Sequence, residues 1–334
     1  MYVGTQLSDD TLSKLGDRYL AQLAQLGLRH VCVDPPGEPA SWTRDDLMRH
    51  VERVSSHGLV LDMIQLPLSS LPIERSQSPH IMLGKSPERD REIEVICRII
   101  ELLADVGIGA AKYNLNIIGI PRTEMEVGRG GSRHEAFRLD QATDGELLTR
   151  AGRVDEEELW ERVDYFLERV VPVAETNGIR LACHPHDPCT PPGYRGVTRV
   201  LGTVEGLKRF VTMHESPVHG LNFCQGTVAE SLEDPRAEIG DVIRWFGTRG
   251  KLMNVHFRNI SGGRYSFREE FPDNGDMDMA ESFRLYRDVG YRHMLMPDHV
   301  PVIDGAAPYE TAFAFCFGYI IAMFQAHGLD PYGG

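Results

Sequence analysis

The sequence predicts a single α/β domain built as a closed (β/α)8 TIM barrel, and three observations favour this fold. Short β-branched runs alternate with longer helical patterns about eight times along the 334 residues. Such alternation is typical of parallel strands covered by helices, and a count of eight favours closure into a barrel. No glycine-rich phosphate turn follows an early strand, since the first two strand-to-helix turns read Gln6-Leu7-Ser8-Asp9 and Pro35-Pro36-Gly37. A barrel therefore fits better than a doubly wound sheet.

Eight segments are expected to be the strands of this barrel. They are short and apolar, and most are bounded by turn residues. In chain order they cover residues 2–5, 28–34, 59–64, 109–115, 178–184, 220–224, 252–257 and 293–298.

The helices are predicted between these strands, where apolar residues recur at helical spacing. They cover residues 9–26, 42–57, 87–106, 155–177, 204–214, 235–246 and 279–289. Residues 9–26 are expected to form one amphipathic helix, since Leu12, Leu15 and Tyr19 share a face with Leu23 and Leu26. Ser41 or Thr43 is placed to cap the second helix, and Gly178 to end the fourth.

Residues 1–334 are expected to form one TIM-barrel domain. The irregular stretch 121–153 contains Gly128, Gly130, Gly131 and many charges, and we expect an excursion over the barrel mouth there. The run 313–324 is apolar on several sides. We expect it to pack on the barrel, with a contact between the two copies of a homodimer as the open alternative.

Composition excludes several classes of function. The chain has 35 Lys and Arg against 49 Asp and Glu, a net charge of −14, and no dense basic run that would grip nucleic acid. No apolar stretch reaches the roughly 18–20 residues that span a bilayer, so no membrane partner is expected. The first residues do not resemble a signal peptide, and six scattered cysteines do not suggest a disulfide framework. A cytoplasmic protein with reduced thiols is predicted.

Ligand-type residues stand at the ends of four successive predicted strands. They are His184, Cys224, His256 and Asp298, separated by 40, 32 and 42 residues, about one strand–helix unit each. Barrel enzymes place their active sites at the carboxyl ends of the strands, so these side chains are expected to converge. A lone histidine or cysteine there would more often be ordinary packing, but four in phase favour a metal site. The mixed donor set leaves Zn2+, Fe2+ and Mn2+ open.

Further polar residues accompany these four. Asn114 ends another strand, Arg122 follows it, and His299 is next to Asp298. His186 shares a proline-bounded loop with His184, and alternation places Arg258 on the face of His256. Each also has an ordinary alternative: Arg258 in an ion pair with Asp or Glu, His186 on a loop surface, Arg122 in solvent.

An ordered set of motifs over about residues 60–325 resembles the mannonate dehydratase family. The segments that carry the resemblance are Ile81-Met82-Leu83-Gly84-Lys85, Tyr113-Asn114, Pro121-Arg122-Thr123, His184-Pro185-His186-Asp187-Pro188, Asn222-Phe223-Cys224-Gln225-Gly226-Thr227, His256-Phe257-Arg258-Asn259-Ile260 and Met296-Pro297-Asp298-His299. The resemblance implies a xylose-isomerase-like barrel that uses a divalent metal, typically Mn2+. By motif the metal ligands fall on His184, Cys224, His256 and Asp298.

The implied reaction is that of a hydro-lyase, which removes water from D-mannonate to give 2-dehydro-3-deoxy-D-gluconate. Tyr309 and His299 are the candidate base and acid, with the two roles unassigned. The substrate contacts expected from the motifs are Asn114, Arg122, His186, Arg258 and Asn259.

The chain departs from the family pattern around the substrate. His186 stands where the family has Asp, Ile120-Pro121 replaces an aromatic residue, and Val300-Pro301 replaces a Gly-Arg pair. These departures leave alternatives open: a sugar isomerase or epimerase on the same barrel, a dehydratase of another aldonate, and a sugar-acid-binding protein without catalysis.

Overall fold

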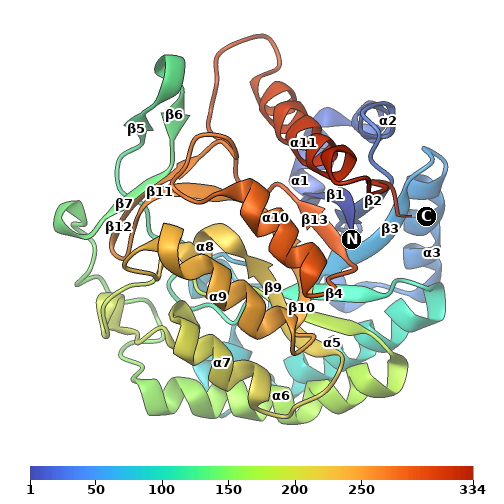
Figure 1. The fold of residues 1–334 in the computed structure, drawn as a ribbon. Coiled ribbons are helices and arrows are strands. Elements are labelled where there is room, and N and C mark those ends of the chain that lie inside the picture. The colour runs from blue at the N-terminus through green and yellow to red at the C-terminus, as the bar shows by residue number, and fades with distance from the viewer. Residues whose placement is uncertain (334) are drawn as a thin grey trace.

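The computed structural model describes residues 1–333 and contains a closed barrel of eight parallel strands (Figure 1). The strands are β1 (Tyr2–Leu7), β2 (His30–Val33), β3 (Val60–Gln65), β4 (Ala110–Tyr113), β8 (Arg180–Cys183), β9 (His219–Cys224), β10 (Leu252–His256) and β13 (Met294–Met296). Their order around the barrel is β1-β13-β10-β9-β8-β4-β3-β2, so neighbours in the chain are neighbours in the barrel. The predicted TIM barrel is therefore confirmed, and each predicted strand overlaps an observed one.

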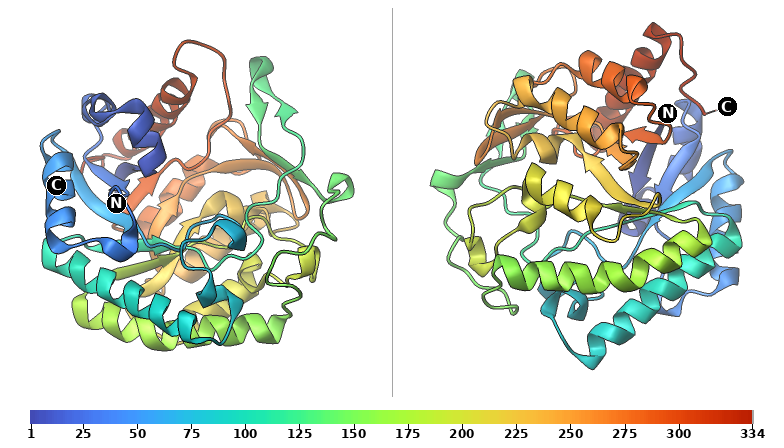
Figure 2. Two further views of the ribbon diagram at one scale, coloured as in Figure 1. Left: turned by 180° about the vertical axis from the view of Figure 1, so that it is seen from behind. Right: turned by 60° about the horizontal axis from the view of Figure 1, so that its bottom comes forward.

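Helices surround the barrel (Figure 2). They are α3 (Arg44–Ser55), α4 (His80–Leu83), α5 (Pro87–Val106), α6 (Glu156–Asn177), α7 (Val204–Thr212), α8 (Gln225–Ala229), α9 (Pro235–Gly247), α10 (Met279–Asp288) and α11 (Pro308–Ala326). Local chemistry sets their ends. Thr43 caps α3 in a capping box with Asp46, and Gly178 ends α6 with left-handed backbone at φ +67°.

The helix predicted over residues 9–26 is instead two helices, α1 (Asp9–Leu15) and α2 (Asp17–Gln25). Gly16 separates them with φ +71° and ψ 178°, and its amide closes α1 by donating to the Leu12 carbonyl oxygen. This backbone geometry is outside the helical region and open mainly to glycine. The apolar spacing continues across the break, which is why the pattern suggested one helix.

The two faces of the barrel strands serve different purposes. On β4, Tyr113 points outward and packs against Phe166 of α6 at 5.6 Å between ring centroids, while Ala110 points inward. The interior contains a small apolar layer rich in sulfur, made of Cys32, Met63, Ala110, Ala182, Met253, Met294 and Met296. All six cysteines are free thiols.

Residues 121–153 form strands of their own and lie beside the carboxyl ends of the barrel strands. β5 (Glu126–Val127) pairs with β6 (Arg133–His134), and β7 (Ala136–Arg138) joins a sheet in the order β11-β12-β7. The hairpin of β11 (Asn259–Gly263) and β12 (Ser266–Glu270) had no counterpart in the sequence prediction.

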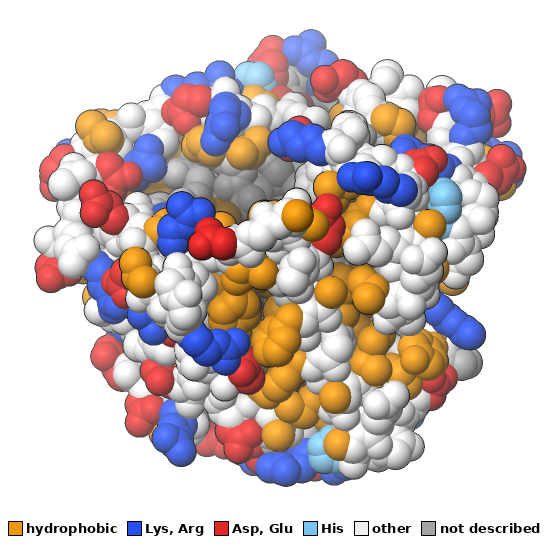
Figure 3. Space-filling model, turned by 90° about the horizontal axis from the view of Figure 1, so that it is seen from above, with side chains coloured by type: hydrophobic (Ala, Val, Ile, Leu, Met, Phe, Trp, Pro, Cys, Tyr) orange, Lys and Arg blue, Asp and Glu red, His pale blue; other side chains and the backbone are white. Residues whose placement is uncertain are grey.

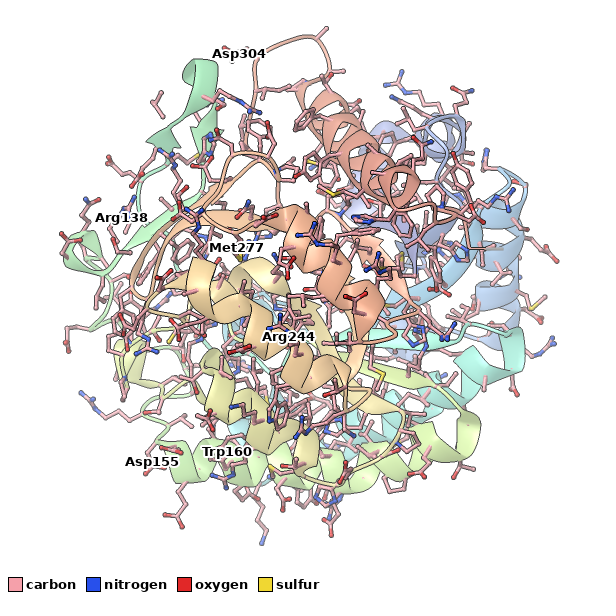
Figure 4. The ribbon with its side chains drawn as sticks, viewed as in Figure 1. Arg138, Asp155, Trp160, Arg244, Met277 and Asp304 are labelled. Carbon is pink, nitrogen blue, oxygen red and sulfur yellow. The ribbon has the colours of Figure 1, made fainter. Side chains whose placement is uncertain are left out.

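The loop between β13 and α11 is tied to the β5–β6 hairpin. The Arg133 amide donates to the Val302 carbonyl oxygen at 2.9 Å, and the Val302 amide donates to the Arg133 carbonyl oxygen at 2.8 Å. Both segments project at the top of the molecule, where Asp304 marks the loop (Figure 4). Within residues 1–333, no helix combines the length and apolar character needed to cross a membrane.

Candidate metal centre and its cavity

A cavity of about 620 Å3 opens at the carboxyl ends of the barrel strands. From above, the molecule shows a hollow with charged side chains along its rim (Figure 3). The polar and aromatic residues that line the cavity include Gln6, Asp34, Gln65, Lys112, Asn114, Arg122, Glu135, His184, Asp187, Asn222, His256, Asp298, His299, Tyr309 and Phe313. This is the position at which barrel enzymes carry their active sites.

The four predicted ligand residues meet at this cavity. His184 follows β8, Cys224 and His256 end β9 and β10, and Asp298 follows β13. One ligand atom from each lies within 4.8 Å of the corresponding atoms of the other three. Cys224, His256 and Asp298 are buried, and His184 is half-buried. The structure thus brings together the set that strand-end position singled out.

Hydrogen bonds orient the two imidazoles for this role. His184 Nδ1 lies 2.7 Å from the carbonyl oxygen of Pro185, so it carries the proton and leaves the Nε2 lone pair available. His256 Nε2 is 3.1 Å from the side-chain amide of Asn222. Its buried Nδ1 has no hydrogen-bond partner among residues 1–333 and lies 3.3 Å from Asp298 Oδ1.

The thiol and the carboxylate complete the set. Cys224 Sγ lies 3.5 Å from the Thr227 amide, from which it accepts, and 3.5 Å from Asp298 Oδ2. Burial alone would raise the pKa of Asp298. The nearby side chains of His256, His299 and Arg258 outweigh this effect and hold that pKa well below its ordinary value. Two imidazoles, a thiol and a carboxylate that meet in this way fit a divalent cation.

A network of buried charges lies behind the ligand cluster, centred on Arg258. Its guanidinium is 2.7 Å from Glu269 Oε1, 2.8 Å from Glu230 Oε1 and 3.2 Å from Asp187 Oδ2. Arg122 contacts the same carboxylates from the cavity side, at 2.6 Å from Asp187 and 2.7 Å from Glu269. Asp187 and Glu269 are therefore each shared by the two guanidiniums.

The pKa directions show how this network is balanced. Burial opposes ionisation of Asp187 and Glu269, but Arg122 and Arg258 outweigh it, lowering the pKa of Glu269 to about 2 and that of Asp187 well below its ordinary value. Burial and the nearby Asp187 raise the pKa of Glu230 well above its ordinary value. The two guanidiniums thus favour the ionised forms of Asp187 and Glu269, as buried carboxylates require.

His299 and Tyr309 both line the cavity. His299 Nδ1 lies 2.8 Å from an Arg258 guanidinium nitrogen and 3.0 and 3.1 Å from the two Glu269 oxygens. Its Nε2 lies 3.8 Å from Asp298 Oδ1. Burial alone would lower the pKa of His299. The charges of Asp298 and Glu269 outweigh this effect and raise that pKa to about 10. A cation bound beside Asp298 would offset part of that effect. Burial and Glu310 raise the pKa of Tyr309, in α11, to about 12.

The expected substrate contacts divide into two groups. Asn114 and Arg122 line the cavity, whereas His186, Arg258 and Asn259 are buried outside its lining. His186 bridges the Leu115 carbonyl and the Leu201 amide, and the Asn259 amide binds the carbonyls of Pro272 and Met277. The structure therefore does not bring His186, Arg258 and Asn259 to the cavity; their polar groups support its wall.

Sequence reasoning missed several polar residues at the site. Gln6 donates to Asp298 Oδ1 at 3.1 Å, Lys112 donates to Gln6 Oε1, and Glu269 holds His299. Strand alternation from Asn114 would have placed Lys112 on the inner face, since the two are separated by one residue. Glu269 belongs to the unpredicted β11–β12 hairpin, whose Gly262-Gly263-Arg264-Tyr265 turn was the available signal.

Comparison with known proteins identifies the family. The model of the D-mannonate dehydratase (UxuA) family matches residues 134–326, more than half of the chain. The chain belongs to the D-mannonate dehydratase family. This places it among the hydro-lyases, as the motifs predicted, and the matched span contains all four ligand residues together with His299 and Tyr309.

Individual proteins agree with this family assignment. Mannonate dehydratase 2 of Halalkalibacterium halodurans is 29% identical over 291 residues, which cover 79% of this chain and 80% of that protein. The crystal structure of mannonate dehydratase from Streptococcus suis serotype 2 superimposes with a TM-score of 0.83 at 23% identity, covering 100% of this chain and 96% of that one.

The barrel type is also confirmed. A xylose isomerase domain protein from Planctomyces limnophilus superimposes with a TM-score of 0.59 at 14% identity, covering 97% of this chain and 98% of that one. At this identity the likeness concerns the fold alone, and it agrees with the expected xylose-isomerase-like barrel.

Proposed function

We propose that this family member is a metal-dependent sugar-acid dehydratase that converts D-mannonate to 2-dehydro-3-deoxy-D-gluconate and water. The observation that carries the proposal is the convergence of His184, Cys224, His256 and Asp298 on a cavity that His299 and Tyr309 also line. Relatives described as mannonate dehydratases support the substrate. The proposed metal is Mn2+, with Fe2+ and Zn2+ as alternatives.

A divalent cation held by the four ligands would act as a Lewis acid toward the carboxylate and hydroxyl of a sugar acid. The protein must then move two protons: one leaves C2, and one joins the departing C3 hydroxyl. His299 and Tyr309 are the proposed pair, since both line the cavity. Asp298 is a poorer base, because a ligand carboxylate loses basicity to its cation.

The buried network gives His299 a fixed orientation. Glu269 contacts His299 Nδ1 through both carboxylate oxygens, so the ring is held with Nε2 on the side of Asp298. Glu269 is itself fixed by Arg122 and Arg258 at 2.7 Å each. A proton-transfer group held in this way is positioned before substrate arrives, which lowers the cost of reaching the reactive geometry.

The decisive experiment is an assay of purified protein against a panel of hexonates and pentonates, with Mn2+ and after treatment with a chelator. We expect a 2-keto-3-deoxy acid from D-mannonate, loss of turnover with chelator, and recovery when Mn2+ is restored. Products of unchanged mass would instead indicate an isomerase or epimerase. Turnover that resists the chelator would contradict the metal assignment.

We also propose a cytoplasmic location and a small-molecule sugar acid as the binding partner, with no nucleic acid or membrane surface. The net charge of −14 supports the exclusion of nucleic acid. A homodimer through α11 remains part of this proposal, since Phe315 on that helix is 43% exposed. Sedimentation at micromolar concentration would test it.

A further inference from the structure

Lys112 is a cation inside the barrel. On β4, Ala111 and Tyr113 belong to the core between barrel and helices, and Ala110 to the apolar layer inside the barrel. Alternation along the strand therefore turns Lys112 inward, where it lines the same cavity as His184, His256 and Asp298. Its neighbour across the β4–β8 ladder is Ala182, a small side chain that leaves space for the lysine stem.

One amide separates the Lys112 ammonium from the ligand cluster. Lys112 Nζ donates to Gln6 Oε1, and Gln6 Nε2 donates to Asp298 Oδ1 at 3.1 Å. The two bonds fix the orientation of the Gln6 amide, because its oxygen must face the ammonium and its nitrogen the carboxylate. The ammonium is thus linked through one side-chain amide to Asp298, one of the residues that would hold the cation.

The cations of the cavity differ in what neutralises them. Arg122 is paired with Asp187 and Glu269, and His299 lies 3.0 Å from Glu269. Lys112 has a neutral partner in Gln6, and within residues 1–333 no carboxylate oxygen lies within 4.0 Å of its nitrogen. Desolvating an ammonium costs free energy in a partly buried cavity that lies on an apolar layer, unless an anion binds beside it. The geometry therefore favours an anionic ligand.

We propose that Lys112 binds the substrate carboxylate and makes the site select sugar acids over neutral sugars. This inference rests on the proposed function and adds a specificity-determining residue to it. When C2 loses its proton to the base, negative charge builds up on the carboxylate oxygens. The adjacent ammonium stabilises that charge without giving up a proton of its own.

The test uses a pair of ligands with one skeleton and different charge, D-gluconate and the neutral alcohol D-glucitol. Their dissociation constants are measured by calorimetry on Mn2+-loaded wild type and on Lys112→Met, Lys112→Arg and the control Lys85→Met, an exposed lysine outside the cavity. For Lys112→Met we expect the preference for gluconate over glucitol to fall by about 10- to 100-fold, as loss of a charged hydrogen bond implies. Lys112→Arg should retain most of the preference, and Lys85→Met all of it.

Two further readouts separate recognition from a structural role. Metal content should be unchanged in Lys112→Met, and with D-mannonate the KM should rise together with a fall in kcat. A gluconate preference within about threefold of wild type would overturn the inference. So would loss of bound Mn2+, which would mean that Lys112 supports the ligands instead of the substrate.

The outcomes also separate this inference from the proposed function. If wild type binds gluconate but dehydrates no hexonate, the proposed function fails, and the change in preference still decides the role of Lys112. If wild type binds neither gluconate nor mannonate, the inference about Lys112 is overturned as well.

Discussion

The two halves of the barrel contribute different chemistry to one cavity. At or just after the ends of strands β8, β9, β10 and β13 stand a histidine, a cysteine, a histidine and an aspartate, the candidate metal ligands. Strands β1 to β4 contribute Gln6, Asp34, Gln65 and Lys112, which are amides and single charges. The family model begins at residue 134, so the matched span contains the half with the ligands. With the proposed roles, the reaction is carried by one half of the barrel and substrate selection by the other, so each could be altered separately.

The largest effect is expected from removing a ligand of the second half. Cys224→Ala should lose the bound divalent cation and lower kcat/KM by on the order of 10³-fold or more, because the proposed Lewis acid is gone. Metal analysis and turnover of D-mannonate measure this. Cys97→Ala, on α5 and away from the cavity, is the matched control and should keep both. A Cys224→Ala protein with full metal content would refute the ligand assignment.

The next effect concerns the proposed acid and base. His299→Ala and Tyr309→Phe should each lower kcat by about 10²- to 10⁴-fold while metal content stays at the wild-type level. Steady-state kinetics with D-mannonate, together with metal analysis, distinguish this pattern from that of a ligand variant. Near-normal turnover in both variants would remove these residues from the mechanism.

Disruption of the buried charge network is expected to reduce stability. Arg258→Met leaves Asp187 and Glu269 without their central partner, which should lower the free energy of unfolding by about 3–5 kcal/mol. Arg244→Met removes an exposed ion pair with Asp241 and should cost under about 1 kcal/mol. Urea unfolding of both variants measures the difference. Equal, small losses would mean that the network is not a structural support.

The smallest effect is expected in the first half of the barrel. Gln6→Met removes one hydrogen bond to Asp298 and one from Lys112, so we expect kcat/KM to fall by about 5- to 10-fold at about 1 kcal/mol. Metal content should not change. A loss as large as that of Cys224→Ala would place Gln6 in the metal centre and erase the distinction between the halves.

The sequence allowed the barrel and the convergence of the four candidate ligand residues to be predicted, because both depend on local periodicity. Strand ends follow from short β-branched runs, and the carboxyl ends of parallel strands meet at one rim. The break at Gly16 was not predictable from spacing, since Leu12, Leu15 and Tyr19 continue the helical pattern across it.

The rest of the site depends on contacts between distant segments. Alternation gave the face of Arg258 but not its partners, since Glu230 follows α8 and Glu269 belongs to an unpredicted hairpin. His186 shares a loop with His184, yet its ring binds the Leu115 carbonyl instead of facing the cavity. Proximity in sequence to a ligand therefore does not determine what a loop side chain contacts.

The pairing of Arg133 with Val302 has a consequence for how the enzyme can change over evolution. The loop between β13 and α11 carries His299 at one end and leads to Tyr309 at the other, and an isolated antiparallel bridge joins Val302 to Arg133 of β6. The loop and the β5–β6 hairpin are joined across the cavity opening. A change in the length of one therefore calls for a matching change in the other. An insertion in the β5–β6 hairpin would shift the spacing of the proposed proton-transfer pair without touching either residue. Changes in length here must therefore come in compensating pairs.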